Sequence, residues 1–106
     1  MAAERGDLRR HQRVALDSPV QVLWRDRSGT DRSANGRIVD VSELGMRIKL
    51  PAAIEKGVYI NFNAHKIPIQ GAASVRSCRA QGTTYLIGLE FTGGLRWKTR
   101  PAGPQA

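Results

Sequence analysis

The chain has 106 residues, enough for one domain with a single modest core. No apolar run approaches the length of a membrane span, and the first ten residues lack the apolar stretch of a signal peptide, so we expect a soluble, cytoplasmic protein. A single cysteine excludes an internal disulfide, and the two histidines lie far apart in the sequence, so we expect no metal site. Seventeen Lys and Arg residues against nine Asp and Glu residues give a net charge of +8, which indicates an anionic partner.

Alternating apolar residues, separated by turn signals, predict six short strands. In chain order they cover residues 14–24, 37–41, 46–50, 58–62, 66–79 and 83–91. The polar residues 25–36 predict a turn, residues 51–57 a short helical turn, and Pro19 an edge, a bulge or a bend in the first strand. No segment has a convincing helical period. The pattern therefore predicts an all-β fold, a closed six-stranded antiparallel barrel.

The two ends of the chain differ in composition from its centre. The first seven residues are polar and small, and we expect them to form a flexible N-terminus. The barrel domain is expected to span residues 8–92. Residues 93–106 carry glycines, prolines and little apolar content, which predicts a flexible tail with little or no helix.

Catalysis has little support in the sequence. Ser42, His11 and Asp40 are residue types of a catalytic triad, but no glycine-flanked nucleophile turn surrounds Ser42. A phosphate-binding loop of the GxxxxGK type is also missing from the sequence. We therefore expect a protein that is not an enzyme and needs no cofactor.

Polar residues interrupt the strand-forming stretch "RIVDVSELGMRI" at residues 37–48. Asp40 and Ser42 are two positions apart, so on an extended chain their side chains share one face. Gly45 follows where the apolar pattern breaks and restarts. Two interpretations stay open: the three residues form a turn-capping group, the usual role of Asp and Ser near glycine, or they line a binding site.

Arginines are clustered just before the first strand, in "LRRHQRV" at residues 8–14. Such a cluster is usually a solvated surface run. Here Arg9 and Arg13, separated by three residues, precede a strand and could close together on one anion. A guanidinium binds phosphates and the acceptor edge of guanine in a forked, bidentate manner, so a compact anion with two phosphates and planar bases would suit this pair.

Together the two motifs resemble those of the bacterial PilZ domain. That family carries RxxxR, here Arg9 to Arg13, followed by D/N-x-S-x-x-G, here Asp40 to Gly45, on a six-stranded barrel. The resemblance covers roughly residues 8–92 and implies binding of the second messenger cyclic di-GMP. Arg9 and Arg13, assisted by Arg10, would then bind phosphate and the guanine acceptor edge. Asp40 would accept hydrogen bonds from a guanine, Ser42 would add a hydroxyl contact, and Gly45 would allow close approach.

The resemblance also implies a signalling role. With no output domain attached, the chain is expected to be a stand-alone receptor or adaptor that acts through an unidentified downstream protein. Binding would order the N-terminal arginine segment, since only Leu8 is apolar there. Leu8 lies just before RxxxR, where the family places a residue able to hold a second ligand. Leucine cannot do so, and we therefore expect one cyclic di-GMP per chain.

An alternative is a small basic β-barrel that binds RNA or single-stranded DNA. Proteins of that kind combine basic grooves with exposed aromatic side chains that stack on bases. Phe62, Tyr85 and Phe91 fall on core-facing positions of the strand pattern. The remaining aromatic residues, and the candidates for stacking, are Trp24, Tyr59 and Trp97. A degenerate PilZ domain that binds only protein is a third interpretation, weakened by the intact motifs.

Overall fold

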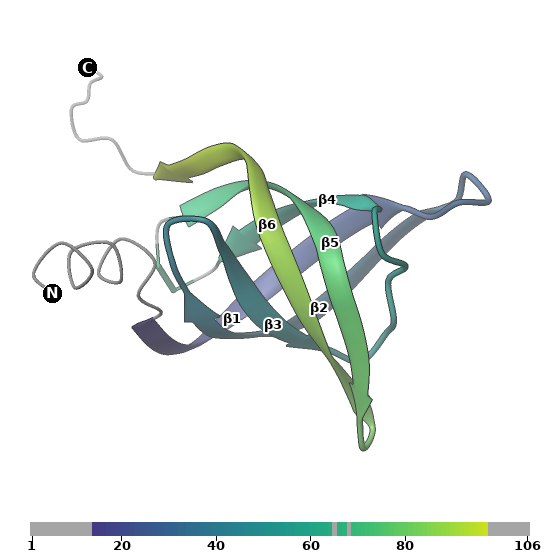
Figure 1. Ribbon diagram of the computed structural model, residues 1–106, viewed down its shortest axis with the longest axis horizontal. Helices are drawn as coiled ribbons and strands as arrows, with labels where there is room; N and C mark the ends of the chain where they lie inside the picture. Colours follow the sequence, from purple (N-terminus) through teal and green to yellow (C-terminus); the bar gives the residue numbers. More distant parts are fainter. Residues whose placement is uncertain (1–13, 65, 68, 98–106) are drawn as a thin grey trace, which may run out of the picture.

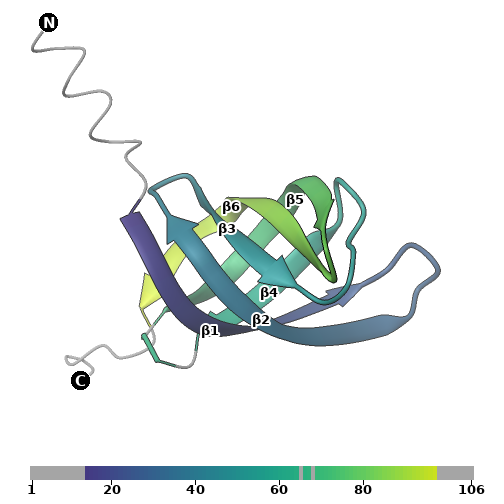
Figure 2. The same ribbon diagram turned by 90° about the horizontal axis from the view of Figure 1, so that it is seen from below.

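A computed structural model describes residues 14–64, 66–67 and 69–97, with the backbone alone described for 93–97. Six antiparallel strands close into a barrel in the order β1-β2-β3-β6-β5-β4 (Figures 1 and 2). The strands are β1 (Val14–Arg25), β2 (Asp31–Val41), β3 (Gly45–Leu50), β4 (Tyr59–Ala64), β5 (Ile69–Gln81) and β6 (Thr84–Trp97). This confirms the predicted all-β, six-stranded antiparallel barrel. The part of the chain that the structure describes holds no helix that could cross a membrane.

The core follows the predicted alternation. Inward-facing residues of all six strands are buried, among them Val20, Val22, Ile38, Ile48, Ile60, Val75 and Ile87. Phe62 is buried, and Tyr85 and Phe91 pack against the core, as their positions in the pattern predicted. The rings of Phe62 and Phe91 lie 5.7 Å apart between centroids. Burial of these apolar side chains is the main term that stabilises the barrel.

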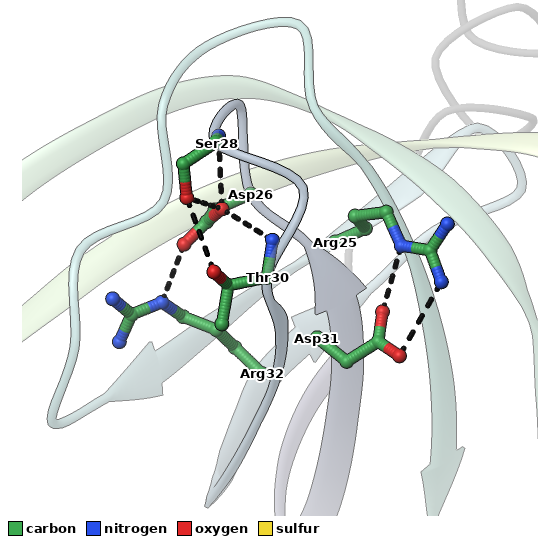
Figure 3. Close-up of polar contacts among 6 residues, drawn as sticks. All are labelled: Arg25, Asp26, Ser28, Thr30, Asp31 and Arg32. Carbon is green, nitrogen blue, oxygen red and sulfur yellow. Dashed lines mark hydrogen bonds and ion pairs between the residues drawn. The ribbon is translucent and has the colours of Figure 1, made fainter.

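The first hairpin is longer than the sequence indicated. Residues 25–36 were expected to form a turn, but β1 and β2 pair as far as Arg25 and Asp31, which leaves only residues 26–30 in the turn. Asp26 organises this turn by accepting hydrogen bonds from the backbone N–H groups of Ser28 and Thr30, both at 3.0 Å (Figure 3). The paired polar residues are mostly exposed, so no apolar alternation marked the strand.

Two other segments differ from expectation. Residues 51–57 form an irregular loop in place of a helical turn; the side chain of Ile54 is buried in the core, and Gly57 donates to Val75 O at 2.8 Å. β6 continues to Trp97, where it pairs with Ile69 of β5. The strand thus extends beyond residue 92, into a segment expected to belong to the loose tail. The low apolar content of that segment gave no strand signal.

Candidate functional site

A β-bulge in β2 determines where Asp40 points. Ile38 pairs with Ile48, but Asp40 pairs with Arg47, so β2 uses two steps where β3 uses one. Asp40 follows Ile38 by two positions, so in a regular strand both side chains would face the core. The bulge places Asp40 on the outer face of the sheet, the face of Arg47, and its side chain is buried there.

Asp40 and Arg47 form the most buried ion pair among the described residues. The side chain of Asp40 is 8% exposed and that of Arg47 is 44% exposed. Arg47 donates two hydrogen bonds to Oδ2 of Asp40, from Nε at 3.0 Å and from Nη2 at 2.5 Å. These hydrogen bonds, and then the charge of Asp40, raise the pKa of Arg47. The pair presents a carboxylate and a guanidinium side by side, which can serve both the donor and the acceptor groups of a planar base.

Arg47 was missed by the sequence analysis. Its only signal is that it lies between the inward-facing Met46 and Ile48, which places it on the outer face of β3. The sequence does not reveal that Asp40 faces the same way, because the bulge that brings the two together leaves no mark in the residue pattern.

Ser42 caps the turn between β2 and β3. Its N–H donates to Gly45 O at 2.8 Å, and its hydroxyl accepts from the N–H of Leu44 at 3.3 Å. The turn-capping role that the sequence left open is therefore present in the fold. The half-buried hydroxyl also keeps acceptor capacity for another donor.

Gly45 lies at a close approach of β3 to β6. It pairs with Glu90, and a Cβ at this position would sit 1.9 Å from the carbonyl oxygen of Leu89. A side chain of any size would collide with the backbone of β6. In the fold, the missing Cβ serves the approach of two strands.

The arginine segment joins the barrel beside Asp40. β1 begins at Val14, which pairs with Val41, and the next residue, Ala15, pairs with Asp40. Arg9, Arg10 and Arg13 themselves lie outside the described residues, as do Leu8 and His11. The RxxxR motif thus ends one residue before Val14, the β1 residue that pairs with Val41, next to Asp40.

Two shallow depressions flank the Asp40–Arg47 pair. One, of about 510 Å³, is bounded by Asp17, Arg37 and Lys49, and Arg37 Nε donates to Asp17 Oδ1 at 2.5 Å. The other, of about 320 Å³, is bounded by Arg76 and Glu90, an ion pair at 2.5 Å, together with Arg47 itself. Each depression holds two cationic side chains and one carboxylate, so positive charge exceeds negative charge in both, which favours an anion.

The structure gives little support to a metal site or to a surface that stacks on nucleic-acid bases. The described part of the chain contains no group of three or more His, Cys, Asp and Glu residues placed to hold a metal ion. Trp24, proposed as a stacking side chain, is only 7% exposed and belongs to the core, so it cannot stack on a base. Tyr59 is 70% exposed, and the side chain of Trp97 lies outside the described residues.

Comparison with protein-family models matches residues 7–96 to the PilZ domain. The match covers most of the chain and includes all six strands except the last residue of β6. No curated protein matches the chain.

Proposed function

The chain belongs to the PilZ domain family, a family of cyclic di-GMP receptors, and we propose that this protein binds cyclic di-GMP at the Asp40–Arg47 pair. It would act as a stand-alone, non-enzymatic receptor in the bacterial cytoplasm and signal through a partner protein. The observation that carries the proposal is the position of Asp40, turned outward by a bulge beside the start of β1.

The site residues have complementary roles in this proposal. Asp40 accepts hydrogen bonds from the N–H groups of one guanine, and Arg47, already beside it, donates to the acceptor edge of the base or to a phosphate. Ser42 adds a hydroxyl contact, while Gly45 keeps its turn close to β6. Arg9, Arg10 and Arg13 bind the phosphates from the segment that enters β1, which becomes ordered as they do so.

Calorimetric titration with cyclic di-GMP tests the proposal directly. We expect a dissociation constant on the order of micromolar, as for a small charged ligand on an open surface. Arg13→Ala should weaken binding by about 1–3 kcal/mol, the scale of a lost charge-assisted contact. Arg79→Ala removes an exposed arginine from β5, away from the start of β1, and is the matched control for a general loss of charge. It should leave the affinity nearly unchanged.

GTP and a short oligonucleotide serve as competing ligands. Absence of binding heat with cyclic di-GMP at high micromolar concentration would contradict the proposal. Equal losses of affinity in Arg13→Ala and Arg79→Ala would mean that binding depends only on the overall charge of the protein. Tighter binding of the oligonucleotide would favour the RNA or single-stranded DNA alternative.

A further inference from the structure

The smaller depression beside Arg47 contains a second pair of an arginine and a carboxylate. Arg76 on β5 and Glu90 on β6 form an ion pair at 2.5 Å, and their side chains are 63% and 50% exposed. Arg47 on β3 lines the same depression, which has a volume of about 320 Å³. The Asp40–Arg47 pair and the Arg76–Glu90 pair therefore lie on neighbouring parts of one surface.

A β-bulge in β5 directs Arg76 to the outer surface. The register between β5 and β6 shifts between Val75 and Ser77, where Arg76 is an extra residue of β5. Val75 is buried, whereas Arg76 and Ser77 are both exposed. In a regular strand only one of two successive residues would face outwards, and the bulge allows both to do so. Like the bulge of β2, this irregularity determines which polar side chains face the depression.

Gly88 of β6 lies in the depression between the two pairs. It pairs with Arg47 of β3 on one side and with Ser77 of β5 on the other, because β6 lies between these strands (Figure 1). A Cβ at Gly88 would lie 2.6 Å from the hydroxyl oxygen of Ser77, so this hydroxyl lies close above the glycine. The exposed side chain of Leu44 also lines the depression. A planar base placed here would thus have backbone beneath it, with an apolar side chain and polar groups around it.

The charges of the depression suit a guanine base better than a phosphate. A phosphate would be attracted by Arg47 and Arg76 but repelled by Glu90. Guanine is uncharged, and its O6 and N7 accept hydrogen bonds from a guanidinium, while its N1–H and 2-amino groups donate to a carboxylate. Adenine has neither an N1–H nor a 2-amino group, so it would leave the Glu90 carboxylate without these donors.

We propose that the Arg76–Glu90 pair recognises the second guanine of the cyclic di-GMP molecule whose first guanine binds at Asp40. This inference rests on the proposed function and adds the residues that determine specificity for the second base. One pair bridges β2 and β3 and the other bridges β6 and β5, so their centres are two strand spacings, or roughly 10 Å, apart. The two guanines of cyclic di-GMP are attached to opposite sides of a ring of two riboses and two phosphates, so one molecule can reach both pairs.

Calorimetric titration of the full chain with two cyclic dinucleotides tests the proposal. One is cyclic di-GMP, and the other is cyclic GMP–AMP, in which adenine replaces one guanine. We expect the mixed ligand to place its guanine at the more buried Asp40 and its adenine at Glu90, where the donors are then missing. The unmutated chain should therefore bind cyclic di-GMP about 5–150-fold more tightly than cyclic GMP–AMP, the range for one well-matched bidentate base contact.

Removal of the whole ion pair isolates its role, because the net charge of the chain stays the same. Arg76→Ala combined with Glu90→Ala should weaken cyclic di-GMP binding and leave the affinity for cyclic GMP–AMP nearly unchanged, so that the two affinities become similar. Arg25→Ala combined with Asp31→Ala removes another exposed ion pair, from β1 and β2, and should keep the discrimination of the unmutated chain. Thermal melting shows whether each variant is folded. If the first double variant does not fold, Glu90→Gln, which keeps the size of the side chain, should reduce the discrimination in its place.

The outcomes separate this inference from the proposed function. Equal affinities of the unmutated chain for the two ligands, or discrimination that persists without the Arg76–Glu90 pair, would overturn the role of the pair while cyclic di-GMP binding still stands. Equal weakening of both ligands by the double variant would mean that the pair contributes to binding without distinguishing the bases, which overturns the proposal as well. Absence of cyclic di-GMP binding by the unmutated chain would overturn both this inference and the proposed function.

Discussion

Replacement of Gly45 by alanine should destabilise the barrel far more than the same change at Gly88. The new Cβ at residue 45 would lie 1.9 Å from the carbonyl oxygen of Leu89 and 3.1 Å from Cα of Glu90. Both contacts are backbone atoms, so no side-chain rotation relieves them, and β3 must separate from β6. Overpacking of this kind costs about 1–3 kcal/mol, and a broken ladder hydrogen bond adds about 1 kcal/mol. We therefore expect a loss of about 3 kcal/mol in the free energy of unfolding.

Thermal melting followed by circular dichroism measures this difference. For a domain of this size, about 3 kcal/mol corresponds to a melting temperature lower by roughly 12–24 °C. Gly88 lies on β6, the strand that Gly45 approaches, but its Cβ would meet only the side chain of Ser77, with the hydroxyl oxygen at 2.6 Å. That side chain can rotate, so Gly88→Ala should cost less than about 1 kcal/mol. Equal melting temperatures for the two variants would refute the close approach of β3 to β6 as the reason for Gly45.

Three further predictions concern pH, a buried hydroxyl and ligand stoichiometry. Hydrogen bonds from Ser28 and Arg32 lower the pKa of Asp26 in the folded chain. As pH falls below about 4, Asp26 becomes protonated in the unfolded chain before it does so in the folded chain, and the stabilisation from these hydrogen bonds is lost. In urea unfolding, the difference in free energy of unfolding between the unmutated chain and Asp26→Asn should therefore shrink over this pH range. The buried hydroxyl of Ser18 has no hydrogen-bond partner within the described residues, so Ser18→Ala should leave the urea midpoint unchanged or raise it, and a clear decrease would reveal a partner. Cyclic di-GMP titrated into concentrated protein should give an inflection near one equivalent, and Leu8→Arg should shift it towards two; two equivalents in the unmutated chain would show that another arginine holds the second ligand.

The fold was predictable wherever one face of a strand is buried. Alternation identifies β1 and β3 almost to the residue, because their inward side chains must be apolar. It fails in the first half of β2, where residues on both faces are exposed or half-buried and the Asp26 turn holds the hairpin. It also fails at the end of β6, where pairing with β5 keeps residues 93–97 in a strand despite two adjacent glycines.

The candidate site was predictable by residue type and spacing, but its geometry was not. The spacing of Asp40, Ser42 and Gly45 indicated a candidate site, and their roles as ligand contacts stay predictions. In the fold, Ser42 closes its turn and Gly45 clears the backbone of β6. The Ser42 turn is local and is one of the two interpretations that the sequence left open. The contact of Gly45 with β6 depends on strand register, which the sequence alone does not give.

The direction in which the Asp40 side chain points depends on the register between β2 and β3. Strict alternation from Ile38 would direct its carboxylate into the core, where an unpaired charge is very costly. The bulge between Ile38 and Asp40 avoids that cost and gives the carboxylate a partner in Arg47. The side chain of Asp40 is 8% exposed and that of Arg47 is 44% exposed, so the guanidinium is the more accessible group of the pair. The extra residue of the bulge thus keeps the Asp40 carboxylate out of the core. It places Asp40 beside the start of β1, where the arginine segment joins the barrel.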